Sequence, residues 1–255
     1  VGDGQGVGDM TPVERAGFLA HSLTARYERA VRQAGEIIAE ALRDLPPAFV
    51  ACSWGKDSVV MLHLIQRQAP NVPVVHVGDR HEDWLSNYSG VRDAYRARWP
   101  IADYHHLETE IGGASVTAAV NGTDLPERYS TRFLGLRLEE NGGRLYALRR
   151  YGAIHQYVTG EQAGQWRVCP LIDWTWMDVW AYTAVHELPH LAAYDHPALG
   201  PKAKSRTSSV YSSRLFRARP DHGGLQLGRV AAMRQYAPKF YDLVAAKSRV
   251  LGDMI

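Results

Sequence analysis

The fold of this chain is decided by residues 49–65, which read FVACSWGKDSVVMLHLI. A short apolar run from Phe49 to Cys52 is followed by small and polar residues, and then by a second apolar run from Val59 to Ile65. This order predicts a buried strand, a tight loop and a helix. Gly55 would let the loop backbone approach a ligand closely, where a Cβ atom would obstruct it.

The loop between this strand and this helix carries groups that bind anions. Two serine hydroxyls, one lysine cation and the free N–H groups of the new helix would point into one space, which suits a phosphate. The spacing of a Walker A loop is absent. The residues predicted to form the site are Ser53, Trp54, Gly55, Lys56, Asp57 and Ser58. The alternative is an ordinary Ser/Gly turn beside a solvated lysine.

The composition is that of a globular protein with one α/β domain and an appendage. The chain has 255 residues, of which 45% are hydrophobic and 22% charged, and its net charge is +2. No apolar run is long enough to cross a bilayer, so no membrane partner is expected. Two cysteines, Cys52 and Cys169, cannot form a disulfide framework or a four-cysteine cluster site, which fits a reducing cytoplasm.

The first 46 residues are expected to precede the α/β domain. Residues 1–10 are rich in glycine and are predicted to be disordered. Residues 11–46 are predicted to form one long amphipathic helix, ended by Pro46 and Pro47. Its apolar positions are Leu19, Leu23, Tyr27, Val31, Ala34, Ile38, Ala41 and Leu45. This face could pack on the chain itself or on a second subunit, so a homo-oligomer stays open.

The rest of the chain alternates between strand and helix patterns. Strands are predicted at 72–77 and 102–107, with a helix between them that ends near Arg98. This alternation predicts a doubly wound parallel sheet, with the ligand at the carboxyl edge of the strands. Residues 112–128 read as a loop with a short helix. Residues 211–255 are predicted to be helical, with a break at Pro238.

Four histidines in this region raise the question of a transition-metal site: His76, His81, His105 and His106. Only the last two are adjacent, and neighbouring strand residues point to opposite faces of a sheet. They could not easily share one ion. The histidines are therefore expected to be ordinary polar residues.

The Ser-x-Gly-Lys-Asp-Ser loop resembles the PP-loop of the ATP-pyrophosphatase superfamily, also called adenine nucleotide α-hydrolase-like. That resemblance implies a Rossmann-like nucleotide-binding domain over residues 47–210. Relatives carry an acidic turn after the second strand, and Glu82 looks like the matching residue, although the sequence around it differs from the common form.

Two further segments resemble the phosphoadenosine phosphosulfate (PAPS) reductase-like branch. Residues 131–144 contain the pattern Gly-x-Arg-x-x-Glu…Arg, so that Gly135, Arg137 and Arg144 would face the substrate. The alternative is that both arginines are exposed and pair with Glu139 and Glu140. Residues 169–180 and 188–195 match other strings of the branch, and the first of these should start a helix with a cap formed by Thr175 and Asp178.

A basic segment follows these markers. Between Asp195 and Asp221 there is no acidic residue, and six cations lie there: Lys202, Lys204, Arg206, Arg214, Arg217 and Arg219. It is predicted to be a mobile loop. Arg206 resembles the arginine with which relatives close over the nucleotide, and the loop is compatible with a DNA substrate. A solvated run of charges is the alternative.

The resemblance leaves two chemistries, cleavage of ATP or reduction of an adenylyl sulfate. Reduction needs a thiolate, and related reductases keep one near the C-terminus, whereas this sequence has no cysteine after Cys169. Cys52 is expected to be buried, and Cys169 to be the more accessible thiol. The chain is therefore expected to be an ATP pyrophosphatase that adenylylates an acceptor.

In this reading the predicted cofactors are ATP and Mg²⁺. The catalytic residues would be Lys56, Asp57, Arg137 and Arg144, with Asp57 holding the metal. The acceptor could be DNA, as in phosphorothioation, with sulfur from a donor partner such as a cysteine desulfurase. Alternatives are a sulfonucleotide reductase, an adenylyltransferase acting on sulfate or FMN, and a non-enzymatic nucleotide-binding subunit of a sulfur-transfer complex.

Overall fold

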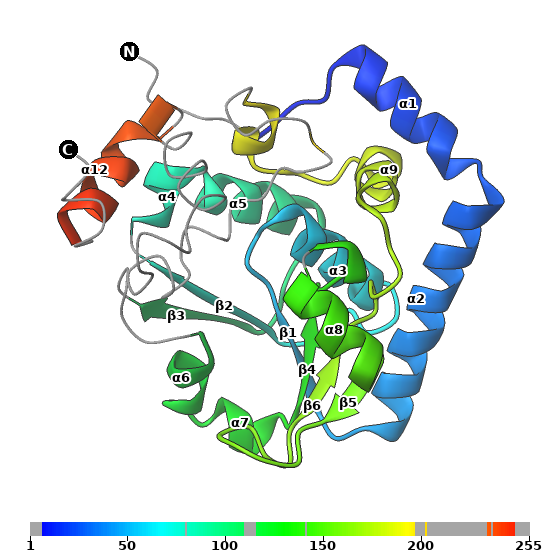
Figure 1. The fold of residues 1–255 in the computed structure, drawn as a ribbon, viewed down its shortest axis with the longest axis vertical. Coiled ribbons are helices and arrows are strands. Elements are labelled where there is room, and N and C mark those ends of the chain that lie inside the picture. The colour runs from blue at the N-terminus through cyan, green and yellow to red at the C-terminus, as the bar shows by residue number, and fades with distance from the viewer. Residues whose placement is uncertain are drawn as a thin grey trace.

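A single sheet flanked by helices forms the body of the molecule (Figure 1). The computed structural model describes residues 7–79, 81–109, 116–140, 142–196, 202, 234–235 and 237–247. Within these residues the sheet has six strands in the order β3-β2-β1-β4-β6-β5. The strands are β1 Ala48–Ala51, β2 Val74–Asp79, β3 Tyr104–Thr109, β4 Thr131–Leu134, β5 Ile154–Gln156 and β6 Trp166–Val168.

All strand pairs are parallel except β5 with β6, which is antiparallel. The predicted α/β class with a doubly wound, mainly parallel sheet is therefore confirmed. The second and third strands begin two residues later than the sequence pattern predicted. Pro73, directly before β2, has no N–H for the ladder, and this suits the position just outside the strand.

Helices cover both faces of the sheet. They are α1 Pro12–Ser22, α2 Ala25–Asp44, α3 Lys56–Gln66, α4 Glu82–Leu85, α5 Tyr88–Arg98, α6 Val116–Asn121, α7 Leu125–Arg128, α8 Gly142–Tyr151, α9 Trp176–His186 and α12 Pro238–Lys247. Two 3-10 turns, η1 Leu138–Glu140 and η2 Ala192–Asp195, lie between them. None of the helices described is long and apolar enough to span a bilayer.

Alternate residues of the strands face two separate cores. Val50 and Val74 belong to the large core, which contains residues of α2, α3, α5 and α9. Phe49 and Val75 point to the other face and pack with Val120 of α6 and neighbouring side chains. The strands are buried on both sides, as expected for a parallel sheet.

The N-terminal segment forms two helices, and the prediction of one continuous helix is wrong. The chain bends at Leu23 and Thr24, and the Thr24 side chain accepts a hydrogen bond from the Tyr27 N–H at 3.3 Å, starting α2. Leu23, predicted to lie on the apolar face, is 88% exposed, whereas Phe18 is buried. A threonine N-cap outweighed the continuous apolar spacing.

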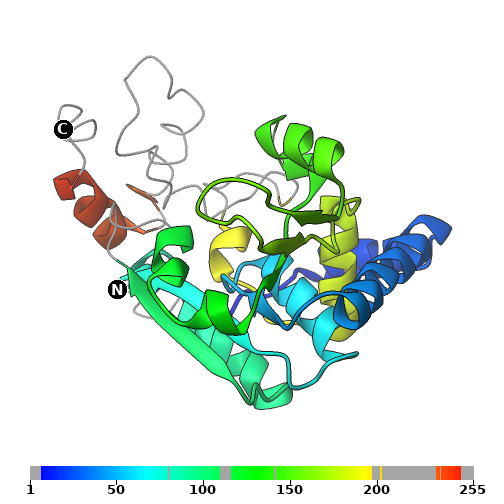
Figure 2. The same ribbon diagram turned by 90° about the horizontal axis from the view of Figure 1, so that it is seen from below.

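Both N-terminal helices pack on their own chain. The Phe18 ring of α1 stacks on Trp180 of α9 at a centroid distance of 5.9 Å, and α2 contacts α3 and β6. α1 and α2 lie at one end of the molecule and α12, which contacts α4, lies at the other (Figure 2). α12 begins at Pro238, where a break was predicted.

The predicted helix cap at Thr175 and Asp178 is present as a capping box. The buried Asp178 carboxylate accepts hydrogen bonds from the N–H and hydroxyl of Thr175, both at 2.7 Å. It also contacts His21 and Arg26, on either side of the bend between α1 and α2. One carboxylate thus joins the N-terminal helices to α9.

We expect Asp178→Ala to lower the free energy of unfolding by about 3 kcal/mol, because several donors lose a buried acceptor. Urea denaturation would measure the change. The control is Asp93→Ala, whose exposed carboxylate pairs with its neighbour Arg92 and whose loss should have a small effect. Equal losses in the two variants would contradict this account of the anchor.

Candidate phosphate-binding site

The predicted strand, loop and helix are all present, and α3 begins at Lys56. The N-cap residue is Gly55, which has no side chain to cap the first turn. The first backbone N–H groups of a helix have no intrahelical partner, so this end of α3 offers donors and a positive dipole to an anion. The strand order reverses between β1 and β4, and the loop follows β1 at this switch point, where open α/β sheets bind ligands.

The two serines of the loop lie beside each other. Ser53 is exposed, and its hydroxyl lies 3.3 Å from that of Ser58. Ser58 donates to the carbonyl oxygen of Gly55 at 2.9 Å, which stabilises the first turn of α3. Ser53 is therefore placed to meet a ligand, while Ser58 mainly shapes the loop.

The Trp54 side chain is part of the core. It is 1% exposed and packs against Tyr95 and Tyr104 at centroid distances of 6.0 and 6.1 Å. Its backbone has a φ of 56°, in the left-handed region that non-glycine residues seldom adopt. The buried indole holds this conformation, so Trp54 serves the loop through its backbone.

A buried cluster of charges stands at the start of α3. The Asp57 carboxylate lies 3.1 Å from Lys56 Nζ and 2.6 Å from Arg137 Nε, and Arg137 Nη1 lies 2.9 Å from Glu139. Lys56 and Arg137 are each 4% exposed. Burial alone would raise the pKa of Asp57, but the charges of Lys56 and Arg137 outweigh it and lower this pKa to about 2.

The structure brings four of the predicted residues together here: Lys56, Asp57, Gly135 and Arg137. Arg137 does pair with Glu139, as the alternative interpretation held, but it is buried rather than exposed. Its contact with Asp57, across 80 positions of sequence, was not foreseen. The backbone of Arg144 lies in α8, and its side chain is outside the described residues.

Gly135 allows β4 to pass close to α3. A Cβ atom there would lie 3.1 Å from the backbone carbonyl of Asp57 and from the N–H nitrogen of Ser58. Such contacts are tighter than normal packing allows. Gly135 was predicted as a nucleotide-binding residue. In the structure, its lack of a side chain lets the end of β4 pack closely against the start of α3.

The family model of the phosphoadenosine phosphosulfate reductase domain matches residues 47–111 and 123–200, more than half of the chain. The chain belongs to this family. The match covers the phosphate loop, the second strand and the segment around Arg137, so the family resemblance inferred from the motifs is confirmed.

Reductases are among the curated proteins similar to this PAPS reductase family member. It is 26% identical to adenosine 5'-phosphosulfate reductase of Geobacillus thermodenitrificans over 65% of this chain and 76% of the relative. It is 29% identical to phosphoadenosine 5'-phosphosulfate reductase of Yersinia pseudotuberculosis over 62% of this chain and 69% of the relative. FMN adenylyltransferase of Candida glabrata is a structural neighbour, with 18% identity and a TM-score of 0.49. The match covers 67% of this chain and 60% of the neighbour.

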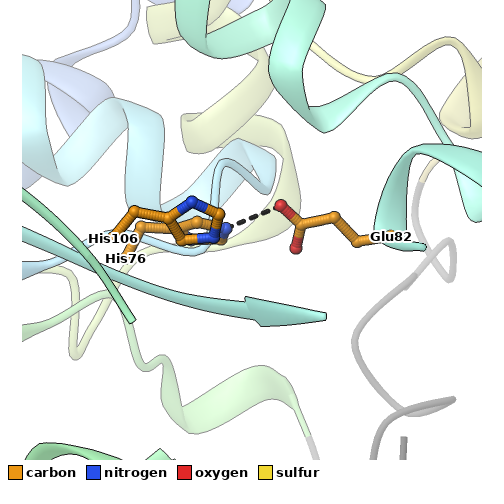
Figure 3. A group of neighbouring side chains, drawn as sticks. All are labelled: His76, Glu82 and His106. Atoms are coloured by element: carbon orange, nitrogen blue, oxygen red, sulfur yellow. Dashed lines mark hydrogen bonds and ion pairs between the residues drawn. The ribbon is translucent and has the colours of Figure 1, made fainter. Parts of the chain in front are cut away.

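Glu82, the acidic residue predicted after the second strand, lies next to two histidines. Glu82 begins α4, and its Oε1 lies 2.8 Å from His76 Nε2 (Figure 3). His76 pairs in register with His106 on β3, so the two rings share one face of the sheet. This pair across strands is not apparent from the sequence, in which only His105 and His106 are adjacent.

Of the cations in the basic segment, the structure describes only Lys202. Lys202 is 9% exposed, contacts Asp195 and lies 3.2 Å from Glu14 of α1. The alternative of a solvated cation is wrong for Lys202, because carboxylates of two other segments hold it. The remaining cations of this segment, including Arg206, lie outside the described residues.

Both cysteines are buried. Cys52 is 2% exposed, as predicted, and burial raises the pKa of its thiol to about 12. Cys169 has 0% exposure, so the prediction of an accessible thiol is wrong. It follows β6 and packs with Leu148 and Ile172 under α8.

We expect Asp57→Asn to lower the free energy of unfolding by about 3 kcal/mol at neutral pH, because two buried cations lose their common counter-charge. Since the folded pKa lies below the unfolded value, the stabilisation is complete above pH of about 4 and is lost as pH falls towards 2. The difference between wild type and variant in urea denaturation should shrink over that range. Asp44→Asn, an exposed carboxylate paired with Arg43, is the control and should change little.

We expect Gly135→Ala to lower the free energy of unfolding by about 1–3 kcal/mol, because the added methyl group pushes β4 away from the start of α3. Gly17→Ala is the matched control, since a Cβ atom there meets nothing within 4 Å. Because Gly17 lies inside α1, alanine should leave stability unchanged or raise it. Thermal unfolding of both variants checks the pair.

Proposed function

We propose that this family member binds ATP at the start of α3 and cleaves it between the α and β phosphates, transferring an adenylyl group to an acceptor. The observation that carries the proposal is the meeting of a helix N-terminus with two buried cations, Lys56 and Arg137, at the switch point of the sheet. Backbone donors and fixed cations suit a polyphosphate better than a neutral ligand.

The charge cluster supports the departure of pyrophosphate. Asp57 holds the side chains of Lys56 and Arg137 in place before a ligand arrives. Cations that are already oriented stabilise the negative charge that develops on a leaving group without the cost of reorganisation. Arg144, which follows Arg137 in the chain and lies in α8, is proposed to add to this charge.

Mg²⁺, when bound, would neutralise phosphate charge and polarise the phosphorus centre. Asp57 is the proposed residue to hold it. Because each of its oxygens already contacts a cation, accepting a hydrogen bond from a metal-bound water fits this carboxylate better than direct coordination.

The state of the two thiols favours adenylyl transfer over reduction. Reduction of a sulfonucleotide requires a thiolate to attack sulfur, and both Cys52 and Cys169 are buried. The names of the similar reductases make sulfonucleotide reduction the second candidate.

For the acceptor we propose DNA in a phosphorothioation-like reaction, with sulfur supplied by a partner such as a cysteine desulfurase. The cations at 204–219 support a nucleic-acid acceptor. Sulfate and FMN are the small-molecule alternatives.

Incubation with α-labelled ATP, Mg²⁺ and each acceptor in turn, followed by product identification, tests the proposal. We expect pyrophosphate release that depends on one acceptor. The rate of release should fall at least about tenfold in Lys56→Met, which keeps the aliphatic stem but removes the charge. Arg149→Ala, an exposed cation of α8, should keep full activity. Absence of pyrophosphate release with every acceptor would overturn the proposed reaction and leave a nucleotide-binding subunit.

Cys169→Ser separates the two candidate reactions. Adenylyl transfer breaks no bond at a thiol, so pyrophosphate release should stay near the wild-type rate, provided that circular dichroism shows a folded variant. Sulfite release from an adenylyl sulfate, abolished by this substitution, would instead establish the reductase. A buried cysteine tolerates serine poorly, so Cys169→Ala serves as the second variant.

A further inference from the structure

Three side chains outside the phosphate-binding loop converge at the carboxyl end of β2. His76 on β2 is buried, His106 on β3 is exposed, and Glu82 stands at the start of α4. Their nearest ligand atoms all lie within 4.8 Å of one another. Figure 3 shows the two imidazole rings stacked on each other, with the Glu82 carboxylate pointing towards them.

The hydrogen bonds of His76 fix the direction of its lone pair. Nδ1 lies 2.9 Å from the carbonyl oxygen of Cys52, which can only accept, so Nδ1 carries a proton. In the neutral ring, Nε2 then presents its lone pair to Glu82, 2.8 Å away. Two acceptors cannot bond without a proton or a cation between them. A metal-bound histidine typically donates its other N–H to a backbone carbonyl, as His76 does.

His106 can complete the set of ligands. Its ring centroid lies 5.0 Å from that of His76, and the two planes are 30° apart. Because the parallel ladder pairs His76 with His106, the backbone holds both residues on one face of the sheet.

The space at this position also fits an ion. Ligand atoms of a tetrahedral zinc site lie about 3.3 Å apart, given bond lengths of about 2.0–2.1 Å. The distance of 2.8 Å between His76 Nε2 and Glu82 Oε1 is close to that spacing, and the ligand atoms of all three residues lie within 4.8 Å of one another. Gly78 lies beneath the group, where a Cβ atom would overlap both His76 and Glu82.

We propose that His76, Glu82 and His106 bind a divalent first-row transition metal ion, for which Zn²⁺ is the best match. Two imidazole nitrogens and one carboxylate oxygen suit Zn²⁺ and its neighbours rather than Mg²⁺, which prefers oxygen ligands. With three protein ligands, a tetrahedral ion would keep one coordination position open. The ion would also brace the Cys52 carbonyl, immediately before the phosphate loop.

The proposal is tested by metal binding without nucleotide, which separates it from the proposed reaction. The full chain is stripped with a chelator and titrated with Zn²⁺ against a chromophoric competitor, and bound metal is counted by mass spectrometry. We expect one ion per chain. His106→Gln and Glu82→Gln should each weaken binding at least about tenfold.

His105→Gln is the matched control, because this residue neighbours His106 but faces the other side of the sheet, with Nε2 2.8 Å from Asp103. It should bind Zn²⁺ as the wild type does. Substitution of Co²⁺ adds a spectroscopic readout of nitrogen ligation, which His106→Gln should change. Less than one ion bound by the wild type, or equal losses in His105→Gln and His106→Gln, would overturn the proposal and leave a hydrogen-bonded histidine–glutamate pair.

Discussion

The candidate site depends on the Asp57 carboxylate, which stands between two buried cations. Lys56 comes from the start of α3, and Arg137 comes from the segment after β4. Without this carboxylate, two like charges would face each other in a region of low dielectric constant, and they would separate. The ion pairs therefore join the ends of two neighbouring strands at the point where the strand order reverses. The positive charge is therefore held in place at this edge of the sheet before any ligand binds.

The loop is held from its other side by aromatic and histidine side chains. The buried indole of Trp54 keeps the loop backbone in a left-handed conformation, and His76 bonds to the carbonyl oxygen of Cys52. The turn after β1 is thus fixed between a charged contact and an apolar one. A metal ion at His76, Glu82 and His106 would add a third support, and it would do so without touching the charge cluster.

The N-terminal helices also reach the site, through a chain of contacts. Glu14 of α1 contacts Lys202, and Lys202 contacts Asp195 in η2. In the same turn, the Tyr194 ring lies under Lys56, with 4.9 Å between Nζ and the ring centroid. A cation over an aromatic face is stabilised when both are desolvated. The helices before β1 therefore support the phosphate loop as well as the core.

The sequence by itself determined what depends on near neighbours. The strand, loop and helix around Gly55 and the cap formed by Thr175 and Asp178 were predictable, because spacing along the chain sets their geometry. The same reasoning missed the bend at Thr24, where a local cap competed with a continuous apolar stripe. Tertiary structure alone decided the contact of Asp57 with Arg137 and the pairing of His76 with His106. Both require two strands to lie side by side in one register, and that register follows from how the whole sheet packs.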